Sequence, residues 1–278
     1  MGDGWYQQPA GRPALPENYF QKPSPARMWN YLQGGKDNYP LDRSAGDAMA
    51  AAQPDSFYLA RQARRFLSRA VRSVAVEAGV RQFLDLGCGL PAPRGLDNVH
   101  EVAQSAHPDA RVVYVDNDRV VLAHAEALLT PLTPAGRCAY IEADVHDVRP
   151  ILVRAGETLD FTRPIGVIMI GVLGHVADFD EALGLVDEVM GAASAGSCLV
   201  VGDGVDDDSA MRQGIARRNE SGIAPYHLRT VEQFQSYFRG LELLRPGIVP
   251  VTLWRPEPTE VGAARPVPSS AGVARKAA

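Results

Sequence analysis

Three aspartates are the residues of this sequence best placed to do chemistry. Asp85, Asp116 and Asp144 each lie at the end of an apolar, strand-like run. If these runs are neighbouring parallel strands, their carboxyl ends open on one edge of a sheet, and the three carboxylates converge on one crevice. Taken singly, Asp116 could be the N-cap of a helix and Asp144 a turn residue. Three aspartates in matching positions favour a binding site for a nucleotide-like cofactor.

Two glycines, one residue apart, follow the first of these aspartates. In the run Asp85-Leu86-Gly87-Cys88-Gly89-Leu90 the chain passes from a buried segment into a loop. Because glycine has no Cβ, such a loop can turn sharply and let a ligand lie against its backbone. The first strand-to-helix turn of an open α/β sheet is where such cofactors bind. A Gly-x-Gly pair alone is also compatible with a plain tight turn.

The cofactor that fits these groups is S-adenosylmethionine (SAM). Its ribose diol can donate hydrogen bonds to Asp116, its ammonium group can face Asp85, and its adenine amino group can donate to Asp144. The rival is a nicotinamide or flavin dinucleotide. Pro91 and Pro93, however, remove backbone N–H groups that would bind a pyrophosphate, and an acidic residue before the glycines would repel it.

Strand-like and helix-like segments alternate along the middle of the chain. We expect strands at 82–86, 111–115, 138–142, 165–172 and 197–202, and helices at 25–32, 57–78, 98–106, 118–129, 179–193 and 230–238. Repeated strand–helix units predict a mainly parallel sheet with helices on both faces. Residues 241–244 and 248–253 flank Pro246-Gly247 and predict a C-terminal antiparallel hairpin. This pattern is typical of the seven-stranded, Rossmann-like α/β fold of class I SAM methyltransferases.

The sequence also resembles an actinobacterial family of SAM-dependent methyltransferases. The similarity lies in an N-terminal signature, Pro23-Ser24-Pro25-Ala26-Arg27-Met28-Trp29-Asn30-Tyr31-Leu32, Gly34-Gly35-Lys36-Asp37-Asn38-Tyr39 and Asp42-Arg43, and in residues 83–91, 98–104 and 114–118. It extends from about residue 22 to Pro256. It implies a class I fold and SAM binding, and the family's substrates are mostly unassigned. Two departures are the segment 92–97, which is longer than the family pattern, and Gly174, where the pattern has a larger residue, often histidine.

The motifs and the resemblance together predict a set of cofactor-binding residues. These are Asp85, Gly87, Gly89, Leu90, Asp116, Asn117, Asp144, Val145, Gly171, Lys36 and Tyr31. Lys36 and Tyr31 belong to the segment 21–56, which we expect to fold over the cofactor as a lid. The alternative for these polar residues is a surface turn.

Two residues are candidates for catalysis on the methyl acceptor. His175 follows the fourth strand, and Tyr39 lies in the expected lid. A base is needed only if the acceptor is protonated at the working pH, and His175 could equally be a loop histidine without a catalytic role. No metal is predicted, because the acidic run at 206–208 is better explained as the cap of the next helix.

Length and composition indicate one α/β domain at residues 21–256, with disordered tails at 1–20 and 257–278. The net charge of −5 gives no general attraction to nucleic acid or to anionic membranes. No segment has the length of a membrane span or the pattern of a secretory signal. Three widely spaced cysteines indicate reduced thiols, so we expect a cytoplasmic protein, with a homodimer as one possibility.

The expected function is therefore that of a SAM-dependent methyltransferase that acts on a small-molecule acceptor by in-line methyl transfer. The sequence leaves open a non-catalytic SAM-binding or regulatory protein and a SAM-dependent enzyme that does not methylate. An NAD-dependent oxidoreductase is a less favoured alternative.

Overall fold

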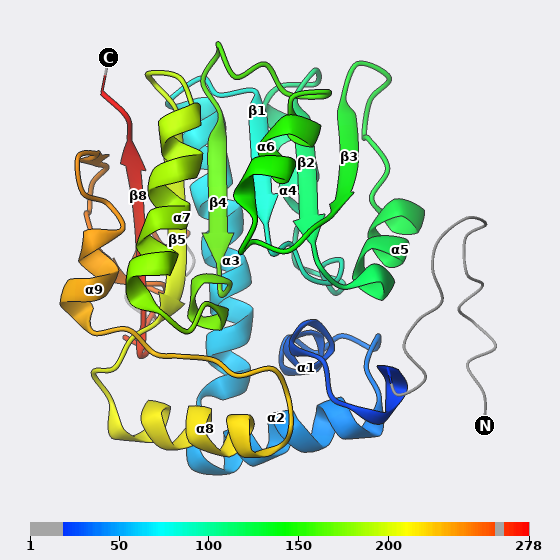
Figure 1. Cartoon of the computed structure of the whole chain (residues 1–278), viewed down its shortest axis with the longest axis vertical. Coiled ribbons are helices and arrows are strands. Elements are labelled where there is room, and N and C mark those ends of the chain that lie inside the picture. The colour runs from blue at the N-terminus through cyan, green and yellow to red at the C-terminus, as the bar shows by residue number, and fades with distance from the viewer. Residues whose placement is uncertain (1–18, 259–263, 278) are drawn as a thin grey trace.

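The strands form one mixed sheet in the order β3-β2-β1-β4-β5-β8-β6, and β7 also pairs with β8 (Figure 1). The computed structural model describes residues 19–258 and 264–277. The strands are β1 Gln82–Leu86, β2 Arg111–Asp116, β3 Arg137–Glu142, β4 Gly166–Ile170, β5 Cys198–Gly204, β6 Glu242–Leu243, β7 Val249–Pro250 and β8 Ser269–Arg275. Neighbours among β1 to β5 are parallel, and β8 is antiparallel to β5, β6 and β7. The predicted mainly parallel α/β sheet is confirmed.

Helices cover both faces of this sheet (Figure 1). The helices are α1 Pro25–Leu32, α2 Pro40–Ala52, α3 Ser56–Val76, α4 Val99–Ala106, α5 Arg119–Leu128, α6 Val148–Ala155, α7 Phe179–Ala192, α8 Ser209–Glu220 and α9 Val231–Ser236, with short 3₁₀ turns η1 Tyr19–Gln21 and η2 Leu173–His175. A capping box opens α9, since the Thr230 side chain accepts from the Gln233 backbone N–H and the Gln233 side chain accepts from the Thr230 backbone N–H.

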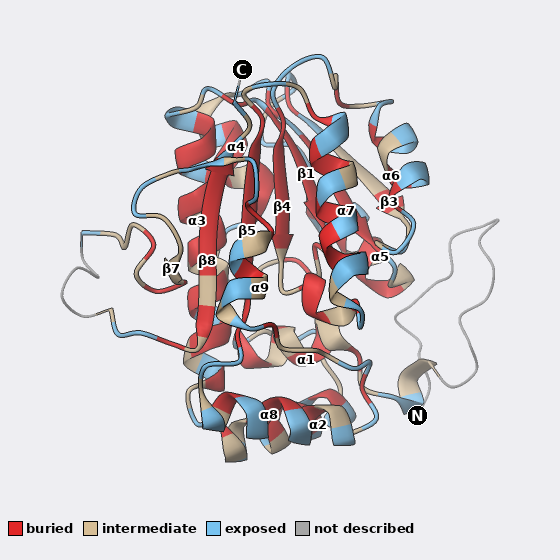
Figure 2. Ribbon diagram, turned by 60° about the vertical axis from the view of Figure 1, so that its left-hand side comes forward, coloured by how far each residue is buried: buried red, intermediate tan, exposed pale blue. Residues whose placement is uncertain are grey.

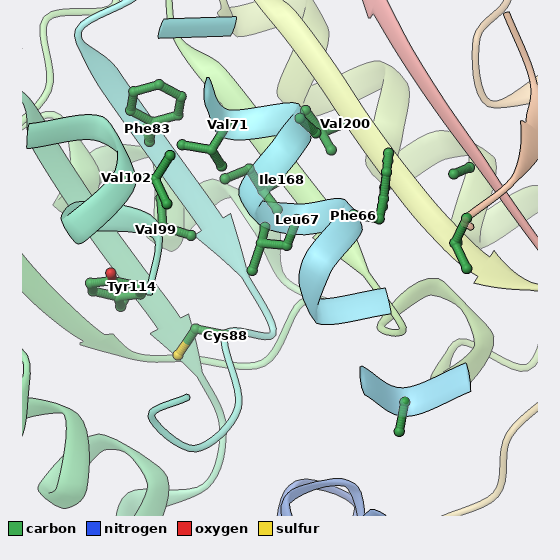
Figure 3. Packing of buried hydrophobic residues seen from close by; sticks show 14 of the residues in the cluster. Phe66, Leu67, Val71, Phe83, Cys88, Val99, Val102, Tyr114, Ile168 and Val200 are labelled. Carbon is green, nitrogen blue, oxygen red and sulfur yellow. The ribbon is translucent and has the colours of Figure 1, made fainter. Parts of the chain in front are cut away.

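The core lies on the two faces of the sheet and is continuous along its central strands (Figure 2). On one face, Phe66, Leu67 and Val71 of α3 lie over Ile168 of β4 and Val200 of β5 (Figure 3). These positions follow helical spacing on α3, as the sequence predicts. The opposite face is covered by apolar residues of α6, α7 and α9. Burial on both faces explains why the strands are continuous apolar runs.

The C-terminal part of the sheet differs from the prediction. We expected 257–278 to be a disordered tail, and this is wrong for β8, whose Ala271, Val273 and Ala274 are fully buried. The predicted hairpin is also wrong, because β6 and β7 do not pair with each other but lie along the same edge of β8. The small residues of β8 resemble the composition of a disordered segment. In the structure they are needed for packing, because a Cβ at Gly272 would lie 2.6 Å from Cζ of Phe238. The strand therefore needs small residues to fit under α9 and its following turn.

Three helices, α1, α2 and α8, lie across the carboxyl ends of the strands and are called the helical cap below (Figure 1). Of these, α2 was not expected from the sequence, whereas α8 is the helix expected after the acidic run 206–208, and Asp208 is its N-cap. They contact each other closely, since a Cβ at Gly214 of α8 would lie 2.9 Å from Cβ of Gln53, just after α2. The segment 21–56, expected as a lid, contains α1 and α2. Of the expected tail 1–20, only Tyr19 and Phe20 belong to the described residues.

The described part of the chain contains no helix that is long and apolar enough to span a membrane. Its three cysteines, Cys88, Cys138 and Cys198, are free thiols, and burial raises the pKa of Cys138 and of Cys198 to about 11. They therefore stay protonated at neutral pH, as expected for core thiols.

Candidate active site

A cavity of about 400 Å³ lies between the carboxyl ends of the strands and the helical cap. This volume is within the range of pockets that enclose small ligands, about 300–1,000 Å³. Ten of the predicted site residues line it: Asp85, Gly87, Gly89, Leu90, Asp116, Asn117, Asp144, Val145, Gly171 and His175. The convergence of the three aspartates at one sheet edge was thus predicted from the sequence.

The turn after β1 has the geometry that its glycines allow. Gly87 and Gly89 have φ values of +72° and +64°, a region that side chains rarely adopt. A Cβ at Gly87 would lie 2.6 Å from Cγ2 of Val172, whereas nothing lies within 4 Å of the corresponding position at Gly89. The backbone at Gly89 is therefore open to the cavity, and a ligand can approach it closely.

Asp116 is fixed at the end of β2 by two backbone hydrogen bonds. Its Oδ2 accepts from the Gly89 N–H at 2.9 Å, and its Oδ1 accepts from the Asp118 N–H at 3.0 Å. Burial raises the pKa of Asp116 to about 6, although these N–H groups oppose the rise. Each carboxylate oxygen can accept a further hydrogen bond, so Asp116 can still bind a ribose diol.

Asp85 is buried at the end of β1, and within the described residues its carboxylate accepts no hydrogen bond. Burial raises the pKa of Asp85 to about 7, and the charge of Asp116 adds to the rise while Arg64 opposes it. A buried carboxylate without a partner is costly, so this one is suited to accept a cationic group of a ligand. The ammonium group of SAM has the required charge.

Asp144 forms a polar cluster with Asn117 and His146 at the β3 end of the cavity. Its Oδ2 accepts from Asn117 Nδ2 at 3.1 Å, and its Oδ1 lies 2.6 Å from His146 Nδ1. Burial alone would raise the pKa of Asp144, but the hydrogen bonds from His146 and Asn117 lower it. Sequence reasoning missed His146, which it could have found two residues after Asp144 in the same loop.

The other half of the cavity contains His175, Arg218 and Tyr226. Nδ1 of His175 lies 2.8 Å from the Pro225 carbonyl oxygen. Because a carbonyl only accepts, Nδ1 must carry the proton, and Nε2 keeps its lone pair. Burial, with the charge of Arg218, lowers the pKa of His175 to about 4, so the imidazole is neutral at neutral pH.

Three predicted residues do not reach this cavity: Tyr31, Lys36 and Tyr39. The hydroxyl of Tyr31 donates to Asp47 on the outer side of α2, and Lys36 is exposed. Tyr39 is the N-cap residue of α2, and its ring lies 5.4 Å from the guanidinium carbon of Arg27. The lid segment folds as two helices: α1 was predicted at 25–32, whereas α2 was not expected.

A different face of α1 lines the cavity, with Met28, Trp29 and Gln33. These residues lie within the N-terminal signature, but the sequence gave no way to tell which face of the short helix points inward. Arg218 was also missed, because the helix expected after the acidic run 206–208 had no predicted length and no predicted inward face. Among the described residues no group of three or more histidine, cysteine or acidic side chains is arranged to hold a metal ion.

An α/β sheet edge with an open glycine turn and two buried carboxylates is suited to a nucleoside that carries a cation. SAM fits this donor and acceptor set, whereas a pyrophosphate would face Asp85 and Asp116. A family model described as S-adenosyl methyltransferase matches residues 17–277. The chain belongs to this family: it has the class I fold, and its cofactor is SAM.

Solved structures agree with this assignment. A DUF574 family protein from Streptomyces avermitilis is 39% identical, with 92% of this chain and 98% of that chain covered and a TM-score of 0.86. A Thermobifida fusca protein, described as a candidate methyltransferase, is 37% identical, with 95% and 98% covered and a TM-score of 0.82. The mitomycin 7-O-methyltransferase MmcR, at 17% identity, 90% and 71% coverage and a TM-score of 0.51, shares the fold. None of the curated proteins matches the chain.

Proposed function

We propose that this protein methylates a small-molecule acceptor that binds in the half of the cavity next to His175. The support is that one cavity contains both the three aspartates and His175, and that Met28, Met49 and Met211 give it an apolar wall. A cavity of this volume is suited to a small molecule.

SAM supplies a methyl group that its sulfonium already activates, so the protein's task is to align the two reactants and to exclude water. In-line transfer is the reaction we propose. Asp85 and Asp116 would hold the ammonium and ribose ends, while the helical cap closes the site from solvent. The cofactor-binding roles of Gly87, Gly89, Leu90, Asn117, Asp144, Val145 and Gly171 belong to the same proposal, since all of them line the cavity.

The tautomer of His175 is the observation that supports a catalytic role for this residue. Its Nδ1–H donates to Pro225, so Nε2 is left as a proton acceptor in a histidine that lines the cavity. An acceptor O–H or N–H can lose its proton to Nε2 as its lone pair attacks the methyl carbon. His175 is therefore the proposed general base.

The test measures S-adenosylhomocysteine released from SAM with a panel of hydroxylated and aminated aromatic small molecules. We expect His175→Ala to lower kcat by about 10²–10⁴-fold and to leave SAM affinity within about twofold. His227→Ala is the matched control, because His227 does not line the cavity and should keep kcat unchanged. If SAM binds but no acceptor gives S-adenosylhomocysteine, the protein is a SAM-binding regulator and not a catalyst.

A further inference from the structure

Arg218 is a buried cation that has no anionic partner among the residues that the structure describes. It lies on α8 with 3% of its surface exposed and lines the acceptor half of the cavity. Within the described residues no carboxylate is its ion-pair partner, and burial alone lowers the pKa of Arg218 to about 10. At neutral pH the guanidinium is still charged. An unpaired buried charge is costly, so its presence calls for an explanation.

The hydrogen bonds of Arg218 leave one edge of the guanidinium free. Both of its bonds come from Nη1, which donates to the Ala224 carbonyl at 2.8 Å and to Asn219 Oδ1 at 2.8 Å. Nε and Nη2 donate to no group among the described residues. These two N–H groups point in parallel from the same edge of the guanidinium. A planar fork of this kind matches the two oxygens of a carboxylate.

The position of Arg218 is fixed by its neighbours in the acceptor half. Its guanidinium carbon lies 5.5 Å from the ring centroid of Tyr226, and that ring meets the ring of His175 edge-on at 5.3 Å. The nearby wall is apolar and includes Met211 and Ile215 of α8. A molecule held here would place an apolar body against α8 and an anionic group on Arg218, within reach of the proposed base.

We propose that the methyl acceptor is a small apolar molecule that carries a carboxylate, and that Nε and Nη2 of Arg218 bind this carboxylate. The inference rests on the proposed function, because it assigns a substrate class to the same acceptor site. It has a consequence for catalysis as well. After burial, the charge of Arg218 is the next cause that keeps the pKa of His175 low, so neutralising that charge would make His175 a stronger base.

The test compares matched acids and amides on the protein saturated with S-adenosylhomocysteine. The probes are benzoate, phenylacetate and 4-hydroxybenzoate, the three corresponding amides, and phenyl phosphate, with binding measured by calorimetry. We expect each acid that binds to be about tenfold or more tighter than its amide, since a charge-assisted bidentate contact is lost in the amide. In Arg218→Gln the acids and amides should bind equally.

Arg217→Gln is the matched control, because Arg217 is exposed and pairs with Glu220 on the outer side of α8. It should keep the preference for acids. The acid–amide comparison on the unmodified protein needs no variant, so a failure of Arg218→Gln to fold does not remove the test. Equal binding of acids and amides, binding of no acid, or binding of phenyl phosphate alone would overturn the proposal. If S-adenosylhomocysteine itself fails to bind, the proposed function fails first.

Discussion

The ring of Tyr226 occupies the space that a side chain at Gly174 would need. A Cβ built at Gly174 would lie 2.4 Å from Cζ of Tyr226. The ring is held there because the Tyr226 hydroxyl accepts from the Gly204 N–H at 3.2 Å, and Asn219 bonds both backbone groups of Tyr226. An aromatic ring from a distant part of the chain therefore fills the space next to Gly174, beside the proposed base His175.

Gly174→Ala should destabilise the protein by about 1–3 kcal/mol, because the ring cannot move aside without losing its hydrogen bonds. Thermal unfolding measures the effect. In a Tyr226→Ala background the same substitution should cost almost nothing, and a double-mutant cycle will show this coupling. Gly184→Ala is the control: nothing lies within 4 Å of its added Cβ, so this helical site should gain about 0.5–1 kcal/mol. Equal losses at both glycines would contradict the proposed contact.

Asp116→Asn should weaken SAM binding by more than about tenfold, since a charge-assisted hydrogen bond contributes about 1.5–3 kcal/mol. Calorimetry with SAM measures this, and NAD is the negative control ligand. The Asn side chain keeps one acceptor oxygen for the Gly89 N–H, but its NH2 group then faces the Asp118 N–H, so thermal unfolding must show that the variant is folded. Unchanged SAM affinity in a folded Asp116→Asn protein would show that the ribose binds elsewhere.

The cofactor half of the site could be predicted because local sequence encodes it. Asp85, Asp116 and Asp144 follow apolar strands, and parallel strands bring their ends to one edge. The acceptor half could not, because its walls come from helices whose positions depend on contacts far along the chain. Arg218 and Tyr226 meet His175 only after α8 has packed on α2.

In the sheet, too, some strands could be predicted from local sequence and one could not. Strands β1 to β5 have the apolar runs that predict buried parallel strands, whereas β8 consists of serine, alanine and glycine with a single valine and a terminal arginine. Its place in the sheet is set by pairing with β5 over seven positions, from Gly204 with Ser269 to Cys198 with Arg275. Periodicity within one segment cannot reveal a partner about 70 residues away.

SAM affinity should rise with pH from about 5 and level off above about 7, because the SAM ammonium pairs with ionised Asp85. The pKa of Asp85 in the folded protein is about 7, above the ordinary 3.8, so the free site must release a proton when it binds the cation. The same linkage applies to folding. Protonated Asp85 contributes to the free energy of unfolding of the ligand-free protein, and this contribution is lost as pH rises from about 4 to 7, because the folded state binds the proton more tightly than the unfolded chain.

Calorimetry in two buffers of different ionisation enthalpy will detect the released proton. Asp85→Asn should bind SAM more weakly and lose the slope near pH 7. A slope that remains below about pH 6 would belong to Asp116, whose pKa is about 6. A pH-independent affinity in the unmodified protein would mean that Asp85 does not pair with the ammonium group.

Truncation after Val267 should abolish the folded protein, although the removed residues have the composition of a tail. The deletion removes β8, which leaves β5 without its antiparallel partner and exposes the side chains that cover Ala271 and Val273. The loss is comparable with the whole stability of a domain, about 5–15 kcal/mol, so we expect little soluble protein and no cooperative thermal transition. Ser269 also lines the cavity and donates to the Asp203 carbonyl, so any folded remnant should lose part of the acceptor site.

Removal of Ala277 and Ala278 alone is the control for this truncation. It keeps Lys276, whose backbone N–H donates to the Ser197 carbonyl and whose Nζ donates to the Ala193 carbonyl at the end of α7. This shorter deletion should leave the transition temperature within about 2 °C of the full chain, because a surface change costs at most about 0.5 kcal/mol. If the chain truncated after Val267 unfolds cooperatively at a similar temperature, β8 is dispensable, and the sheet must close on β5 in another way.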